Sequence, residues 1–225
     1  MDDLSPRLRA LCDLEVAEAR EYSGRHEYDG SIQDLSPGGV RNGLARLAAA
    51  AAASGPADDP HDEAHLAAFE KRAQVVFGDL ELHRRSPLPH LEGLDLACYD
   101  RDYGPAQDRD LARRAHLAAW PQAVDAAVAS LDQLSSPVAT ALLGGIRGLA
   151  AGIPADAPDD ARAAAAGAHA RLAAHVERAA RDGDPDPALG HAGLTALMSS
   201  AESMDVDLGR LAEREIGRAS CRERV

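Results

Sequence analysis

Two histidines four residues apart form the pattern in this chain that most resembles a chemical site. The segment from His61 to His65, HDEAH, places both imidazoles on one face of a helix, with the spacing of the His-Glu-x-x-His zinc motif. Asp62 takes the place of the general-base glutamate and is one methylene shorter, so it would hold an attacking water differently. The segment also follows Pro60, and acidic side chains are favoured in a first helical turn. We therefore expect a solvated helix start rather than a metal site.

A second histidine–glutamate pair and a cysteine–histidine combination carry weaker signals. His26 and Glu27 begin the same zinc motif, but Gly30 stands where the second histidine is needed. Cys98 and His90 would offer a thiol and a base, yet the sequence suggests no third group to orient them. A Gly-x-Ser-x-Gly nucleophile elbow is also missing from the sequence. These patterns favour structural roles for the residues concerned.

Three alternating aspartates have the spacing of the first ligands in a calcium-binding loop. They are Asp182, Asp184 and Asp186. Such a loop needs a glycine next, where this chain has Pro187, and a final glutamate, where it has Gly193. We expect these carboxylates to cap helices and shape a turn. The sequence thus assigns no catalytic, cofactor-binding or metal-binding residue to this chain.

Composition predicts an all-α protein, so helices must position any site. Alanine and leucine favour helix, and β-branched runs that could build strands are scarce. Serine–proline and aspartate–proline pairs mark helix starts and divide the chain into roughly eight to nine helices with no significant β-sheet. The approximate helical ranges are 5–22, 36–55, 59–86, 106–119, 121–134, 136–152, 156–183, 188–200 and 206–215.

Three local patterns predict how these helices pack. Trp120-Pro121 should break or kink its helix, because proline removes a backbone donor and crowds the previous turn. Gly144, Gly148 and Gly152 lie four apart and should let a neighbouring helix approach closely. Apolar residues at three- and four-residue spacing predict one buried stripe in the helix over 59–86: Leu66, Phe69, Ala73, Val76, Phe77, Leu80 and Leu82.

Net charge and cysteine usage exclude several classes of partner. The formal net charge is -13, and an acidic protein is repelled by phosphate backbones and anionic lipids, so we expect no nucleic-acid or membrane partner. The start of the chain, residues 1–4, lacks the apolar core of a signal peptide. Cys12 and Cys98 are too few and too far apart for a disulfide framework. We therefore expect a reduced, cytoplasmic protein.

The last ten residues predict a boundary in the chain. Residues 216–225 are similar to one reading frame of a common sequencing-adapter oligonucleotide. On this resemblance we expect 216–225 to be a non-native tail, which has to be set aside before the fold is considered. Residues 1–215 would then be the N-terminal helical region of a larger protein, with its chemistry in the missing part.

Several segments together resemble the bacterial family called domain of unknown function 885. The first are Gly24–Gly30 with Asp34–Pro37, and Leu80–Pro89. The stretch from Ala118 to Leu131 follows in the same order, and after it come Leu189–Leu197 and Asp207–Leu211. The resemblance covers roughly residues 5–215. Members of this family resemble zinc metallopeptidases of the long-helical, thermolysin-related kind.

This resemblance implies a role as the helical wall of a cleft in a zinc-metallopeptidase-like hydrolase. The intact protein would bind zinc and act on a peptide. The family's metal motif, a His-Glu pair followed by a Gly-His-His run, has no match here, so no catalytic residue is carried over. The fragment would be inactive alone, with the missing C-terminal half of its own chain as partner. The alternative is a stand-alone acidic helical binding or scaffold module, which needs no catalytic residues.

Overall fold

The computed structural model describes residues 4–214, and within them the predicted all-α fold is confirmed, with no strand. The predicted tail, 216–225, lies outside the described residues. The helices are joined by short 3-10 segments at 26–28, 97–100 and 149–152 and by a π-helical segment, Gln74–Asp79. Residues 208–214 are also helical. The α-helices are α1 (Pro6–Leu14), α2 (Val16–Glu21), α3 (Pro37–Ser54), α4 (Pro60–Ala73), α5 (Leu82–Arg85), α6 (Leu88–Leu94), α7 (Ala106–Ser130), α8 (Ser136–Gly148), α9 (Asp159–Asp182) and α10 (Gly190–Glu202).

Side-chain caps explain why three N-terminal helices begin where the sequence predicts. The Ser5 hydroxyl accepts a hydrogen bond from the backbone of α1 at 3.3 Å, and the Ser36 hydroxyl does the same for α3 at 3.0 Å. The Asp59 carboxylate accepts from the His61 amide in α4 at 2.7 Å. Each capping residue precedes a proline, whose missing N–H costs nothing in the first turn.

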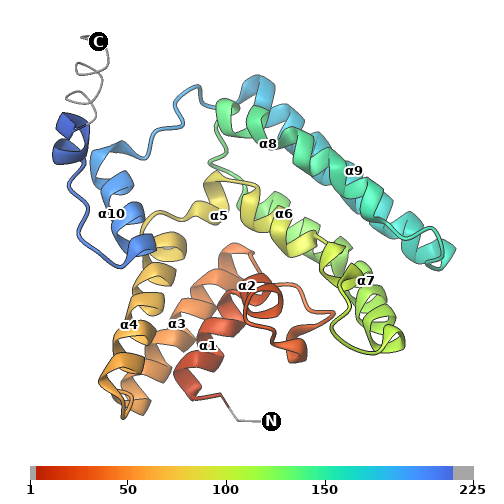
Figure 1. The fold of residues 1–225 in the computed structure, drawn as a ribbon. Helices are drawn as coiled ribbons and strands as arrows, with labels where there is room; N and C mark the ends of the chain where they lie inside the picture. Colours follow the sequence, from red (N-terminus) through yellow and green to blue (C-terminus); the bar gives the residue numbers. More distant parts are fainter. Residues whose placement is uncertain (1–3, 215–225) are drawn as a thin grey trace, which may run out of the picture.

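The helices form two groups (Figure 1), and each group buries one of the two larger core clusters in the described residues. In the N-terminal group α1 packs on α3 and α4, and Leu14, Val40 and Phe77 are among its buried residues. In the second group α9 lies along both α7 and α8. Trp120 of α7 and Leu172 of α9 are fully buried there. The second core is the larger, so it supplies more apolar burial.

The predicted break at Pro121 is wrong, because α7 runs without interruption from Ala106 to Ser130 with Pro121 inside it. The neighbouring turns explain this result. Trp120, just before the proline, is 1% exposed, and Val124, about one turn after it, is 0% exposed. Burial of these side chains outweighs the local cost of an internal proline, which is about 3 kcal/mol.

The two other local predictions also need correction. A Cβ added to Gly144, Gly148 or Gly152 would meet no atom within 4 Å, so no helix approaches this face closely. Helix α8 instead packs on α9, and its buried residues are Ala139 and Ile146. In α4 the predicted stripe is only partly buried, and Phe69 is 49% exposed. This side chain falls at the edge of the face that carries the buried Ala73 and Phe77.

Helix α10 is held to the rest of the molecule by little buried surface. It contacts α4 and the π-helical segment, and Ser200 is its only buried residue. The segment that leads into it, 183–189, is not helical. Figure 1 shows α10 at one corner, away from the α7–α9 group. Few buried apolar contacts mean a small free energy of local opening.

We therefore expect the α10 amides to exchange with deuterium well before those of α9. The physical reason is that α9 would have to open the larger core, whereas α10 can detach alone. Hydrogen-exchange mass spectrometry would measure this difference, and limited proteolysis should cut first within residues 184–189. Equal protection of α9 and α10 would contradict the expectation.

Candidate functional site

A groove of about 910 Å³ lies between helices α4 and α10. The π-helical segment closes one end through Val75 and Asp79. Small side chains make up most of the groove lining, so the backbone of a bound segment could approach closely. Its lining comprises Ala64, His65, Ala67, Ala68, Lys71, Val75, Asp79, Ala196, Ser199, Ser200, Ser203, Met204 and Asp205.

Charged groups occur at a few points in this mainly small and apolar lining. Lys71 is the only lysine in the chain. Asp79 and Asp205 supply carboxylates, and Met204, which is 60% exposed, supplies an adaptable apolar side chain. A few polar groups within an apolar recess are the usual composition of a binding site. The groove therefore suits a peptide or a helix with small or apolar side chains.

The two histidines singled out from the sequence lie beside this groove. His61 and His65 project from the first turns of α4, and His65 is one of the lining residues. Their Nε2 atoms are 3.2 Å apart, with the rings edge to face. Among residues 4–214 no group of three or more metal-ligating side chains is assembled.

A buried arginine fixes the position of α4 and with it one wall of the groove. The Arg7 guanidinium in α1 donates to the carboxylates of Glu63 and Glu70 at 2.7–3.1 Å and to the Gly55 carbonyl at 2.9 Å. Hydrogen bonds to Glu70 and Glu63 raise the pKa of Arg7, and the bond from Arg7 lowers the pKa of Glu63. These paired charges join helices that are far apart in sequence.

A smaller cavity of about 320 Å³ lies between α3, the π-helical segment and α5. His83 lines it, is 2% exposed, and has a buried Nδ1 without a hydrogen-bond partner in the described structure. Burial lowers the pKa of this imidazole. Glu81 beside it has a φ of 47°, an unfavourable conformation for a residue other than glycine. Sequence analysis did not identify this cluster, because His83 is part of no recognisable motif.

A second cavity of about 320 Å³ lies between α6 and the glycine-bearing face of α8. Trp120 lines it, and the buried indole N–H has no hydrogen-bond partner within residues 4–214. Burial raises the pKa of Glu92, another lining residue. The open space beside Gly148 and Gly152 therefore belongs to this cavity rather than to a helix contact.

A buried polar network joins α2 to α7. The His116 Nε2 donates to the Gly93 carbonyl at 2.8 Å, so its Nδ1 accepts a bond from the Tyr99 hydroxyl at 3.0 Å. Tyr99 also accepts from the Gly30 amide at 2.8 Å, and Arg20 lies 3.5 Å from His116. Burial lowers the pKa of His116 to about 3 and raises that of Tyr99 to about 12. At neutral pH His116 and Tyr99 are therefore both uncharged, which suits a structural role beside Arg20 rather than a proton shuttle.

The cysteine–histidine combination is not a catalytic pair. Cys98 is buried, and burial raises the pKa of its thiol, which disfavours the reactive thiolate. His90 donates its Nε2 proton to the His83 carbonyl at 2.8 Å. Burial lowers the pKa of His90 to about 4. Both side chains therefore have structural roles.

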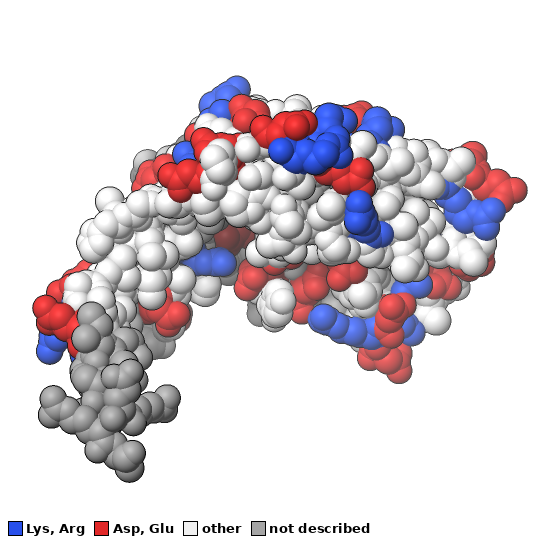
Figure 2. All heavy atoms as spheres, turned by 90° about the horizontal axis from the view of Figure 1, so that it is seen from above, with Lys and Arg blue, Asp and Glu red and all other residues white. Residues whose placement is uncertain are grey.

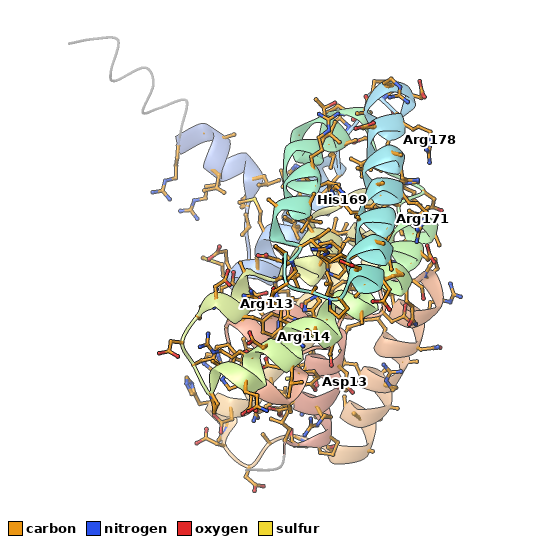
Figure 3. All side chains as sticks on the ribbon, turned by 90° about the vertical axis from the view of Figure 1, so that its right-hand side faces the viewer. Asp13, Arg113, Arg114, His169, Arg171 and Arg178 are labelled. Carbon is orange, nitrogen blue, oxygen red and sulfur yellow. The ribbon has the colours of Figure 1, made fainter. Side chains whose placement is uncertain are left out.

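The remaining candidate residues anchor loops and helix ends. The Asp184 and Asp186 carboxylates accept from backbone amides two residues ahead, as a turn requires. His26 stacks on Tyr103 with ring centroids 4.3 Å apart. His169 donates to the Ile146 carbonyl at 2.9 Å and so links α9 to α8 (Figure 3).

The visible surface does not form a patch of one charge. Figure 2 shows acidic and basic side chains interspersed over this face of the molecule. Arg171 and Arg178 of α9 project outward in Figure 3, and Arg171 pairs with Asp125 at 2.9 Å. Among residues 4–214, every helix is too short or too polar to cross a bilayer.

Comparisons with protein-family models, curated proteins and solved structures give no match for this chain. The similarity to domain of unknown function 885 therefore stays a prediction based on the segments named above. Among these three recesses the groove between α4 and α10 has the greatest volume, about 910 Å³ against about 320 Å³ for each of the others.

Proposed function

We propose that residues 4–214 form the non-catalytic helical wall of a binding cleft in a zinc-metallopeptidase-like hydrolase. The observation that carries this proposal is the α4–α10 groove, with its volume of about 910 Å³ and its lining of small side chains. Such a wall would hold a peptide in place while residues elsewhere in the protein carry out the reaction. Positioning of this kind contributes to catalysis by reducing the entropy lost on reaching the transition state.

The lining of the groove supports a peptide as ligand. Alanine and serine side chains let a peptide backbone approach, and Val75 and Met204 offer apolar contacts. Lys71 can pair with a carboxylate of the ligand, and Asp79 or Asp205 with a basic group. Helix α10 is the weakly attached wall, so the width of the groove can adapt.

The proposal assigns the zinc ligands to the missing C-terminal half of the chain. Residues 4–214 hold no group of three or more side chains able to bind a metal ion. The Arg7 network holds α4 rigidly from the side of α1. The α4 wall of the groove would thus be preorganised, while the chemistry would come from later elements.

The second candidate is a stand-alone acidic helical binding or scaffold module. One observation favours it: the exposed large apolar residues come from several different helices. They include Leu8 in α1, Leu88 in α6, Leu111 in α7 and Leu194 in α10. A region cut away from its other half should instead expose one contiguous apolar face. In this case the groove would bind a separate partner.

Recovery of the gene beyond codon 215 separates the two candidates. The proposal expects a downstream His-Glu and Gly-His-His motif, one zinc ion per intact chain and peptide hydrolysis, while the 225-residue chain stays inactive. A stop codon within a few codons would contradict the peptidase role and favour the module. Peptide cleavage by the 225-residue chain alone would contradict both.

We expect Ala68→Trp to raise the KM of the intact enzyme by about tenfold or more, because the indole fills the groove and weakens ligand binding. Its zinc content should not change. Ala141→Trp, at an exposed position on α8, is the matched control and should leave KM unchanged. Steady-state kinetics with metal analysis would test this. Equal KM values for the two variants would exclude the groove as the peptide site.

A further inference from the structure

The distance between the Nε2 atoms of His61 and His65 matches that of two ligands on one metal ion. Their Nε2 atoms are 3.2 Å apart, and their ring planes are 78° apart with centroids at 4.4 Å. First-row divalent ions bind imidazole nitrogen at about 2.0–2.1 Å. Two such ligands are separated by about 3.0 Å at a right angle and by about 3.4 Å at a tetrahedral angle. The observed distance lies between these values.

We propose that His61 and His65 form a two-point chelate for a borderline divalent first-row ion, such as Zn²⁺, Ni²⁺ or Cu²⁺. Neutral imidazole nitrogen is a preferred ligand of these ions, whereas Mg²⁺ and Ca²⁺ prefer oxygen. Two protein ligands leave other coordination positions to water or to a bound molecule. Because His65 lines the α4–α10 groove, the ion lies at its edge, within reach of a ligand in the groove.

The surroundings of the pair also favour a cation. Both imidazoles are exposed, so an ion reaches them without opening the fold. The N-terminal end of a helix carries a partial positive charge that disfavours a cation. The neighbouring acidic residues Asp58, Asp59 and Asp62 offset that charge. The opposite side of α4 is held to α1 through the Arg7 network, which gives the two histidines a rigid base.

This site is distinct from the zinc centre expected in the intact protein. A peptidase centre uses three protein ligands, and the proposed function assigns these to the missing half. The histidine chelate is contained in residues 4–214 and forms whether or not a peptidase motif follows. Failure of one proposal therefore leaves the other intact. The competing explanation for the 3.2 Å distance is a hydrogen bond between two neutral rings.

Calorimetric titration of the tag-free 225-residue chain with Zn²⁺, Ni²⁺ and Cu²⁺ in turn, at neutral pH, tests the chelate. We expect one saturable site per chain, with Cu²⁺ bound more tightly than Ni²⁺ or Zn²⁺. His61→Ala and His65→Ala should each abolish this site. His191→Ala, at an exposed histidine of α10, is the matched control and should bind as the parent does.

Spectroscopy gives a readout that does not depend on affinity alone. Electron paramagnetic resonance of the Cu²⁺ complex should show two nitrogen ligands in the parent chain and in His191→Ala. Circular dichroism should show that both chelate variants keep their helix content, since the two side chains are exposed. A parent chain that binds none of the three ions, or a His61→Ala variant that binds them unchanged, would overturn the proposal.

Discussion

Acidification from pH 7.5 to 5.0 should remove about 3–4 kcal/mol of stability through His90 and His116. Burial lowers the pKa of His90 to about 4 and that of His116 to about 3. An exposed histidine in the unfolded chain has a pKa of about 6.5. Between pH 6.5 and these lower values, the unfolded chain binds two protons that the folded chain does not. The stability that these groups confer is therefore complete above pH 6.5 and is lost as the pH falls towards 4 and 3.

Two carboxyl groups, Glu15 and Glu92, act in the opposite direction. Burial raises the pKa of Glu15 and of Glu92, so these groups take up protons more readily in the folded chain as the pH falls. Their contribution reduces the net loss near pH 5. His83, whose pKa burial also lowers, adds to the loss. Three histidines oppose two carboxyls, and the pKa values of His90 and His116 are lowered to about 4 and about 3, so we expect net destabilisation.

Urea unfolding at pH 7.5, 6.0 and 5.0 would measure this dependence. Trp120, the only tryptophan, is buried and reports unfolding by fluorescence. The midpoint should fall at each step. His90→Gln should show about half of the histidine-linked loss, because one of the two strongly shifted groups is then gone. An unchanged midpoint across the three pH values would show that these histidines take up protons as readily in the folded chain as in the unfolded chain.

Replacement of His116 by leucine should destabilise the protein by about 2–4 kcal/mol. Leucine is similar in size to histidine, so the main loss is that of hydrogen bonds rather than of packing. The Gly93 carbonyl loses its donor at 2.8 Å, and the Tyr99 hydroxyl loses its acceptor at 3.0 Å. His116 is 0% exposed. Water therefore cannot replace either bond without a local opening of the fold.

Chemical unfolding at pH 7.5, where His116 is neutral, would measure this effect. His191→Leu on the exposed face of α10 is the control and should lie within about 0.5 kcal/mol of the parent. A double-mutant cycle with Tyr99→Phe should show coupling, because the two side chains share a hydrogen bond. Additive effects would mean that the network contributes nothing beyond packing.

Local signals predicted the helices well because their causes are local. Ser5, Ser36 and Asp59 cap the helices that follow them, and α9 begins and ends near the predicted residues. Predictions that depended on neighbours in space were less successful. Pro121 lies inside one continuous helix, and the face bearing Gly148 meets a cavity instead of a helix.

The candidate site could be predicted only in part. His61 and His65 stood out because a four-residue spacing on a helix brings side chains together. The groove beside them could not be predicted, since its other wall, α10, lies about 130 residues further along the chain. The cavities beside His83 and Trp120 were missed for the same reason.

The sequence by itself determined the all-α class, the starts of the helices at Pro6, Pro37 and Pro60, and the pairing of His61 with His65. Periodicity and capping act over a few residues, so the chain carries that information locally. The tertiary structure decided which faces are covered. It placed Arg7 against Glu70, 63 residues away, and Arg20 against His116, 96 residues away. Such contacts depend on how all the helices pack at once, which no local pattern specifies.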